Sequence, residues 1–376
     1  MRFSSISNQR GSVEVRSQTS EVGNLQTTNS KLPTASESQS ITNDQSSTTP
    51  EIVVVGNIDA STDWSEALKG MEAVVHLAAR VHIMDDTAED PLAAFREVNV
   101  DGTRRLAEEA AKAGVKRFVF ISSIKVNGEE TGGMRSAVEG RKSDVRGQWS
   151  EVGRGRKSGR GAEVRGRRSE DRAKNQELRT KNLTAAFSKR DTPNPEDPYG
   201  QSKWEAEVEL RKIEASTGMQ VVILRPPLLY GPGVKANFLK LIQLVDKGIP
   251  LPLGSIRNKR SLLSLTNFAD LISRCVTDER AAGETFTVCD GDDLSTAELV
   301  KRIAKALGKK PHLLPVPEGV IKLAGKLTGK SAQVQRLCSS LQIDSSHVRK
   351  TLDWEPPCTM EQELERVSQW FKSPKS

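Results

Sequence analysis

The sequence predicts an α/β protein with a doubly wound parallel sheet and a smaller C-terminal lobe. Short apolar runs such as Ile52-Val53-Val54-Val55 are continuous and rich in β-branched residues, as expected for strands buried on both faces. These runs alternate with stretches of ten or more residues that have helical periodicity. Such alternation requires long crossover connections, and these join parallel strands covered by helices on both faces.

Six core elements follow from the positions of these runs and of their turn residues. They are expected at residues 52–55 (strand), 73–79 (strand), 91–114 (helix), 117–121 (strand), 197–217 (helix) and 219–224 (strand). Beyond Tyr230 the alternation loosens into short helices, a strand near residues 284–289 and a last helix around residues 360–370. This part is predicted to be mainly a substrate-binding lobe.

Two stretches differ from this core in composition. Residues 1–50 contain nineteen Ser or Thr and one aromatic residue, Phe3, so they bury too little apolar surface to offset their chain entropy. Residues 134–190 carry 17 Lys or Arg against 7 Asp or Glu, repeat short Arg- and Gly-rich motifs, and contain few apolar residues. Both stretches are expected to be disordered.

The predicted organisation therefore has five parts. They are a disordered segment in place of the first βαβ unit (1–50), the sheet core (51–133), a basic low-complexity insert (134–190), the continuation of the core (191–230), and mainly the substrate lobe (231–376).

Charge, cysteine content and the length of apolar runs restrict the class of protein. The whole chain has a net charge of +7, and the insert alone carries +10, so the remaining body is mildly acidic at −3. The four cysteines have neither metal-ligand spacing nor the density of a disulfide scaffold, and no metal site is expected. No apolar run is long enough to span a bilayer and no secretory h-region is present, so a cytoplasmic location is expected.

One group of residues indicates acid–base chemistry. Tyr199 and Lys203 lie one helical turn apart at the start of a predicted helix, and a nearby ammonium group would lower the pKa of the phenol. Ser122 and Ser123 end a predicted parallel strand, at the sheet edge where ligands of such folds bind. A Tyr-x-x-x-Lys pair alone is weak evidence, but the serines upstream favour a catalytic group.

With these residues in order, the chain resembles the extended short-chain dehydrogenase/reductase family of NAD-dependent epimerases and dehydratases. The resemblance rests on several segments that occur in the family's order. They are His76-Leu-Ala-Ala79, Asn99-Val-Asp-Gly-Thr103, Ile121-Ser-Ser123, Tyr199-x-x-x-Lys203 and Leu224-Arg-Pro226. The segments 122–128, 225–238 and 251–254 are most similar to the UDP-glucose 4-epimerase-like and 4-keto-sugar reductase-like branch. The resemblance covers about residues 51–130 and 185–370, and implies a Rossmann-like fold.

The resemblance also implies roles for individual residues. Tyr199 would be the acid–base catalyst, Lys203 would orient the nicotinamide ribose, and Ser123, with Ser122 beside it, would complete the catalytic group. The residues expected to contact NAD, or NADP, are Leu77, Ala78, Ala79, Asn99, Asn57 and Pro226. Asn237 and Phe238 would approach the uracil of a UDP-sugar, and Arg260 would face its diphosphate, for which a guanidinium group is suited.

The sequence departs from the family pattern at its start. The family opens with a strand, a Gly-x-x-Gly-x-x-Gly loop and a helix whose N-terminus binds the pyrophosphate, and residues 1–55 contain no such motif. Asn57 stands where an acid is usual, Leu228 lies near where many 4-epimerases have a substrate-binding Asn, and the insert enters just before Tyr199.

Three functions are therefore compatible with the sequence. The first is an NAD(P)-dependent nucleotide-sugar 4-epimerase or 4-keto reductase, expected as a homodimer, in which hydride transfer at sugar C4 accompanies proton transfer by Tyr199. The second is a degenerate, inactive member of the family. The third is binding of nucleic acid or an acidic surface by the basic insert, which its interleaved acids and scarcity of aromatics make unlikely as a nucleic-acid module.

Overall fold

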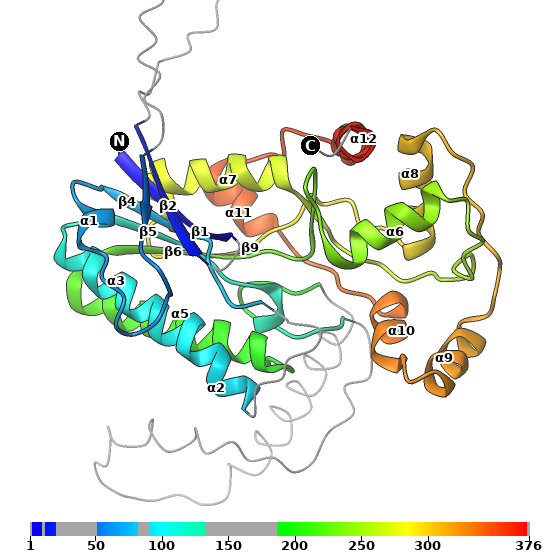
Figure 1. Cartoon of the computed structure of the whole chain (residues 1–376), viewed down its shortest axis with the longest axis horizontal. Coiled ribbons are helices and arrows are strands. Elements are labelled where there is room, and N and C mark those ends of the chain that lie inside the picture. Colours follow the sequence, from blue (N-terminus) through cyan, green and yellow to red (C-terminus); the bar gives the residue numbers. More distant parts are fainter. Residues whose placement is uncertain (1, 10–11, 20–50, 82–89, 132–185, 374–376) are drawn as a thin grey trace, which may run out of the picture.

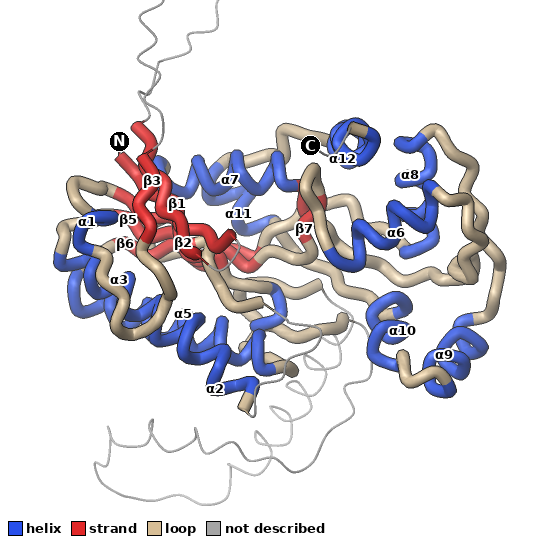
Figure 2. Tube along the Cα trace, viewed as in Figure 1, coloured by secondary structure: helices blue, strands red, loops and turns tan. Residues whose placement is uncertain are grey.

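A computed structural model describes residues 2–9, 12–19, 51–81, 90–131 and 186–373 of the chain. Figure 1 shows a sheet with helices on both sides and a second lobe beside it, and Figure 2 shows most of the strands gathered in the first of these two bodies, with β7 apart from them on the side of the second lobe. The predicted α/β architecture with a C-terminal lobe is confirmed. No helix within the described ranges combines the length and apolarity needed to cross a bilayer.

The main sheet has seven strands in the spatial order β3-β2-β1-β4-β5-β6-β9. Strands β1, β4, β5, β6 and β9 are parallel neighbours, whereas β2 runs antiparallel to both β1 and β3. Their bounds are β1 Arg2–Gln9, β2 Ser12–Thr19, β3 Glu51–Val54, β4 Ala73–His76, β5 Arg117–Ile121, β6 Gln220–Arg225 and β9 Thr285–Thr287. A two-stranded ladder pairs β7 Leu229–Tyr230 with β8 Leu263–Ser264.

Two apolar layers cover the sheet. On one face, Phe118, Phe120 and Ile223 of the strands pack with Leu106 of α3 (Thr103–Lys112) and Leu210 of α5 (Pro198–Thr217). The opposite face packs against α7 (Leu265–Thr277) and α11 (Ser346–Leu352). The continuous apolar runs of the sequence reflect this double coverage, because side chains on both faces of β4, β5 and β6 are buried.

The predicted helix over residues 91–114 is a continuous helical segment with a change of winding in its middle. It consists of α2 (Pro91–Arg96), the π-helical turn η1 (Glu97–Gly102) and α3. Asp90 caps its start, with its carboxylate accepting the N–H of Ala93 at 3.1 Å. Asn99 lies within this π-helical turn. Such turns shift the helix register and often occur at functional sites, which favours a functional position for Asn99.

The prediction of disorder is wrong for residues 2–9 and 12–19, which form β1 and β2. β1 pairs with β4 along Phe3–Ile6, in the place that the missing first strand of the fold was expected to leave empty. Sheet pairing uses main-chain groups, so the Ser-rich strand β1 can satisfy the open edge of β4. The alternation of Val13 and Val15 in β2 is a local β signal that the average composition of residues 1–50 concealed. Residues 20–50 lie outside the described residues.

The second lobe contains five helices around an apolar core that includes Phe238, Ile242, Val300 and Leu364. They are α6 (Ala236–Asp246), α8 (Thr296–Leu307), α9 (Glu318–Leu327), α10 (Ser331–Cys338) and α12 (Met360–Lys372). The chain crosses between the two bodies several times, because β9 is a strand of the main sheet and α7 and α11 pack against that sheet. Residues 231–376 are thus divided between the two bodies. Short elements complete the description: α1 (Ser65–Leu68), η2 (Ile124–Val126) and η4 (Glu279–Ala281).

The last residues of the predicted disordered insert belong to the folded body. Phe187 is buried with Ile124, Leu341 and Ile343, and its N–H donates to the carbonyl oxygen of Gln342 at 2.8 Å. The expectation of disorder is therefore wrong for residues 186–190. A single aromatic ring in a polar stretch can be buried in an apolar site that distant segments form. The rest of the insert, up to residue 185, lies outside the described residues.

The pairing of β1 on both sides gives a direct test. Ser5 lies opposite Val75 of β4 and Arg16 of β2, so every main-chain group at this position faces a strand. Ser5→Pro should lower the free energy of unfolding by about 3 kcal/mol, because proline removes a ladder hydrogen bond inside a sheet. Ser5→Thr, which suits a strand, should leave it within about 0.5 kcal/mol. Urea unfolding measures both, and equal stability of the two variants would contradict the position of β1.

Candidate active site

The start of α5 is held against the segment that follows β5. Asp197 caps the helix, its carboxylate accepting the N–H of Gly200 at 2.7 Å, and it also pairs with the ammonium group of Lys125. A Cβ atom on Gly200 would lie 2.9 Å from the carbonyl oxygen of Lys125, so this approach requires glycine. The close packing brings Tyr199 next to the carboxyl end of β5.

The two serines at that end have different partners. Ser123 lies near the phenol of Tyr199, and its hydroxyl acts to lower the pKa of that phenol. The hydroxyl of Ser122 instead donates to the carboxylate of Glu207 at 2.5 Å and is buried. The structure therefore brings Ser123 and Tyr199 together, and places Ser122 in the support behind them.

Lys203 is buried one helical turn from Tyr199 in α5. Its ammonium nitrogen lies 4.0 Å from the centre of the Phe120 ring, and burial lowers its pKa to about 7, partly opposed by Glu207. The pKa of Tyr199 is raised to about 12 by burial and by the charge of Asp197, against the opposing effect of Ser123. The expectation of a lowered tyrosine pKa is therefore not met, because burial and the charge of Asp197 outweigh the effect of Ser123, while the ammonium of Lys203 lies over the face of Phe120.

A buried ion pair supports this arrangement and was missed by the sequence analysis. Glu207 accepts hydrogen bonds from Arg225 at 2.9 Å and 2.5 Å, and a further guanidinium nitrogen of Arg225 donates to Asn127 at 3.1 Å. Both charged side chains are almost fully buried. The sequence did contain a signal for this pair. Residues 199, 203 and 207 are spaced by four and lie on one face of α5, and Arg225 ends the next strand.

Asn99 connects the loop after β4 to α5. Its side-chain oxygen accepts the N–H of Arg80 at 2.8 Å, and its amide nitrogen donates to the carbonyl oxygen of Arg80 and to the hydroxyl of Ser202, each at 3.0 Å. Ser202 in turn donates to the carbonyl oxygen of Tyr199 at 2.8 Å. Asn99 was predicted to contact NAD, and in this structure its amide holds the main chain of the loop after β4.

His76 is a second buried polar residue beside the lysine. Its Nε2 lies 2.9 Å from the hydroxyl of Thr103, and its ring packs edge-on to Phe118. Burial lowers its pKa to about 3, and the positive charge of Lys203 acts in the same direction. A neutral imidazole therefore lies under the site, within the electrostatic reach of Lys203.

The other predicted cofactor residues lie at the carboxyl edge of the sheet with different exposure. Leu77 is exposed, Ala78 is buried and Ala79 is half-buried after β4. Pro226 is buried after β6, and its carbonyl oxygen accepts the N–H of Ile124 at 3.0 Å, which holds the ends of β5 and β6 together. Asn57 is exposed after β3. All these strand ends face the same edge, as the parallel arrangement requires.

The fit to a dinucleotide differs between its two halves. The nicotinamide half would lie against Tyr199, Lys203 and Pro226, which the fold gathers at the ends of β5, α5 and β6. The pyrophosphate half needs a helix N-terminus after β1, but β1 pairs directly with antiparallel β2, from Gln9 opposite Ser12. Within the described part of the chain, no helix begins between β1 and β3. The described residues thus fit the reactive end of the cofactor and not its phosphates.

The predicted substrate residues lie in or beside the second lobe. Asn237 is exposed in the first turn of α6, and Phe238 is buried and stacks on Tyr230 at 5.9 Å between ring centres. Arg260 donates to two carbonyl oxygens at the end of α10, that of Arg336 among them, at 2.8 and 3.2 Å. Burial lowers the pKa of Arg260. The ring of Phe238 and the guanidinium of Arg260 are therefore both engaged within the protein.

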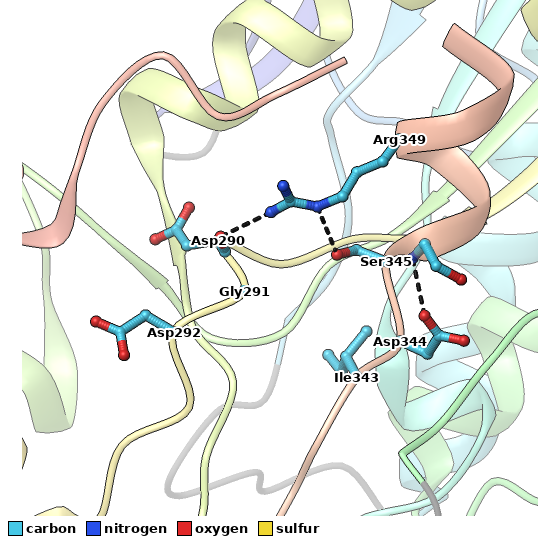
Figure 3. Close-up of a pocket in the computed structure, with 8 residues that line it drawn as sticks. Asp290, Gly291, Asp292, Ile343, Asp344, Ser345 and Arg349 are labelled. Carbon is cyan, nitrogen blue, oxygen red and sulfur yellow. Dashed lines mark hydrogen bonds between the residues drawn. The ribbon is translucent and has the colours of Figure 1, made fainter. Parts of the chain in front are cut away.

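A cavity of about 530 Å³ lies away from the Tyr199 group, open toward solvent. It is lined by Asp290, Gly291, Asp292, Ile343, Asp344, Ser345, Ser346 and Arg349. Figure 3 shows that its polar groups bond to one another: the guanidinium of Arg349 donates to the carbonyl oxygen of Asp290 at 2.9 Å and to Ser345 at 3.3 Å. None of the predicted site residues contributes to this cavity.

Comparison with known proteins gives matches over most of the chain. A family model described as male sterility protein matches residues 57–264, and one described as GDP-mannose 4,6 dehydratase matches residues 181–367. A UDP-glucose 4-epimerase of Vibrio cholerae is 45% identical over 318 residues, 84% of this chain and 82% of that protein. An N-acetyl-glucosaminyl-diphospho-undecaprenol 4-epimerase of Escherichia coli O157:H7 is 27% identical, with 85% and 84% covered.

Solved structures show the same fold. UDP-glucuronic acid 4-epimerase from Bacillus cereus in complex with NAD matches with a TM-score of 0.56 and 18% identity, over 83% of this chain and 76% of that one. MoeE5 in complex with UDP-glucuronic acid and NAD matches with a TM-score of 0.57 and 18% identity, over 84% of each chain. The chain thus belongs to the NAD-dependent epimerase/dehydratase family, a family of enzymes.

The unusual position of Lys203 predicts a dependence of stability on pH. Its pKa is about 7 in the folded protein and 10.5 in an ordinary lysine, so between these values the unfolded chain binds the extra proton and stability rises with pH. From pH 7 to pH 9 the free energy of unfolding of the wild type should rise by about 2 kcal/mol relative to Lys203→Met.

Urea unfolding at pH 7, 8 and 9 measures this difference. Lys212→Met is the matched control, because this lysine lies on the solvent side of the same helix and is 65% exposed. It should keep the rise seen in the wild type. A Lys203→Met variant with the same pH dependence as the wild type would show that the lysine has an ordinary pKa.

Proposed function

We propose that this protein is a UDP-sugar 4-epimerase in which Tyr199, Ser123 and Lys203 perform the acid–base chemistry. The observation that carries the proposal is the position of Ser123 near the phenol of Tyr199 at the carboxyl end of β5, with Lys203 buried one helical turn further along α5. The 45% identity to a UDP-glucose 4-epimerase favours epimerisation over simple reduction of a 4-keto sugar.

In this mechanism Tyr199 exchanges a proton with the hydroxyl oxygen at sugar C4. Ser123 lies near the same phenol and would hold the sugar oxygen in line with it. Because the pKa of Tyr199 is raised to about 12, the phenol is protonated at neutral pH and is prepared to act as an acid. To act as a base it needs the charge of Lys203 closer to its oxygen, and Lys203, with a pKa of about 7, exchanges its own proton near neutrality.

The cofactor proposed for this site is NAD, with NADP as the alternative, and when bound it supplies the hydride acceptor and donor for sugar C4. Leu77, Ala78 and Ala79 would line its path from the end of β4, and Asn57 and Asn99 would lie on its adenosine side. Pro226 would contact the nicotinamide end from β6. These residues form the edge of the sheet that the described structure assembles.

The proposed substrate contacts come from the second lobe. Asn237 is exposed at the start of α6 and is available to a uracil base, whereas Phe238 would support it through its packing on Tyr230. Arg260 would bind the diphosphate after exchanging the carbonyl oxygens at the end of α10 for phosphate oxygens. The homodimer and the cytoplasmic location stay predictions.

A second candidate is favoured by one specific observation. β1 leads into antiparallel β2, so the described chain offers no helix N-terminus to the cofactor phosphates. Such a chain would keep the family fold and its acid–base residues, and would bind dinucleotide too weakly to turn over substrate.

Two measurements on the purified full-length protein distinguish these functions. NADH and NADPH are titrated while nicotinamide fluorescence is followed, and UDP-glucose and UDP-galactose are then assayed for interconversion with added NAD. The epimerase predicts saturable binding and interconversion without net change in cofactor redox state, whereas a 4-keto reductase consumes NADH. Absence of binding up to millimolar cofactor would establish the second candidate, a family member that does not turn over substrate.

The catalytic role of the tyrosine has its own test. Tyr199→Phe should lower kcat about 10²- to 10⁴-fold, because it removes the proton donor and keeps the ring that packs against Phe95. NADH binding should be unchanged in this variant. Thr217→Val is the matched control, since it removes a hydroxyl at the far end of the same helix, where that group donates to the carbonyl oxygen of Ile213, and it should retain activity. Equal activity of the Tyr199→Phe variant and the wild type would refute the assignment.

A further inference from the structure

The helical hairpin α9–α10 presents an apolar stripe to solvent. Val320, Leu323 and Leu327 are 54%, 58% and 79% exposed, which are large values for such side chains. Their spacing places them on one face of α9. The opposite face is used in the fold, because Ile321 is buried and Gly325 lies against Val334 of α10. The stripe is therefore a second apolar face on a helix that has already packed its first.

Lysines lie along the same helix, next to the stripe. Residues 318–338 contain Lys322, Lys326, Lys330 and Arg336 and one acid, Glu318, a net charge of +3. The acid pairs with Lys322 at 2.7 Å, which leaves the positive charge concentrated toward the end of α9 and the following turn. Outside the 134–190 insert, the chain as a whole carries −3, so this hairpin is a local positive region on an acidic body.

These two properties identify the kind of surface that would cover the stripe. A second copy of the chain would bring Lys326 and Lys330 against their own equivalents, and like charges across an interface oppose association. An anionic lipid bilayer offers negative headgroups to the lysines and an apolar interior to the leucines, the arrangement found for helices that lie in the membrane interface. Lysine stems of this length extend past an apolar face and keep their charges in the headgroup layer.

We propose that the α9–α10 hairpin is a docking surface for the anionic lipid bilayer, with Val320, Leu323 and Leu327 buried among the acyl chains. The protein would lie on the membrane without crossing it. The docked hairpin is joined to the substrate side of the protein: Gln335 of α10 donates to Glu130 at 2.7 Å, and Arg260 donates to the carbonyl oxygen of Arg336 at 2.8 Å. Docking would therefore hold the Arg260 side of the second lobe close to the headgroups.

Vesicle co-sedimentation of the full-length protein tests the apolar contribution. Vesicles of phosphatidylcholine with 30% phosphatidylglycerol are compared with pure phosphatidylcholine vesicles. The double variant L323S/L327S keeps every charge, including those of the basic insert, and should bind the anionic vesicles at least about tenfold more weakly than the wild type. Val54→Ser, at another exposed apolar position, should bind like the wild type. Equal binding of L323S/L327S and the wild type would overturn the proposal.

A local fluorescent probe separates the hairpin from any other site of attachment. The four cysteines are buried, so a cysteine introduced by Thr328→Cys, next to Leu327, accepts an environment-sensitive nitrobenzoxadiazole label at an exposed position. On anionic vesicles its emission should shift to the blue, and the same label at Lys212→Cys on α5 should not respond. No shift at residue 328 overturns the proposal, whatever the total binding.

Sedimentation velocity without lipid tests the competing occupant. The wild type and L323S/L327S should have the same sedimentation coefficient if the stripe faces a bilayer. If L323S/L327S changes the wild-type oligomer into a smaller species while vesicle binding is unchanged, the stripe is an interface between copies of the chain and the proposal is wrong.

Discussion

The buried ion pair between Glu207 and Arg225 is the interaction on which the geometry of the candidate site depends. Two charges inside a protein are tolerated only when their hydrogen bonds are satisfied, and removing one partner typically costs about 3–5 kcal/mol. Here Ser122 donates to Glu207 and Asn127 accepts from Arg225. These four side chains come from α5, β6, the end of β5 and the end of η2. Their mutual satisfaction fixes where the start of α5 meets β5, and so where Tyr199 meets Ser123.

In this fold one N-terminal segment usually provides both a central strand and a phosphate-binding helix N-terminus. Here β1 and β2 provide the strand without the helix. A strand beside β4 is needed to satisfy main-chain groups in the middle of the sheet, and β1 provides it with a polar sequence. Binding of a pyrophosphate needs free N–H groups at a helix N-terminus, and an antiparallel strand has none to offer because its N–H groups pair within the sheet. The sheet order of the family is thus complete, while its phosphate site is not built by the described residues.

Burial is the main influence on the electrostatics of the candidate site. Lys203 lies over Phe120 with a lowered pKa, Tyr199 has a raised one, and Arg260 bonds to carbonyl oxygens in its own lobe. Burial is the largest cause of both pKa shifts; the charge of Glu207 opposes the shift of Lys203, and the charge of Asp197 adds to that of Tyr199. A diphosphate or a ribose would change these partners more readily than it would change the sheet, because the sheet is held by main-chain pairing and two packed apolar layers.

The sequence by itself determined the elements whose signals are local. Apolar runs marked β4, β5 and β6, the Asp197-Pro198 cap marked the start of α5, and the spacing of Tyr199 and Lys203 marked the helix that carries the candidate site. Tertiary structure alone decided what depends on distant partners. The strand state of residues 2–9 and 12–19 required the open edge of β4, and burial of Phe187 required an apolar site assembled by other segments. The Glu207–Arg225 pair and the direction of Lys203 depended likewise on side chains far away in the chain. Periodicity and capping act within a few residues, whereas the choice of a partner for a strand edge or a buried charge is made only when the chain has folded.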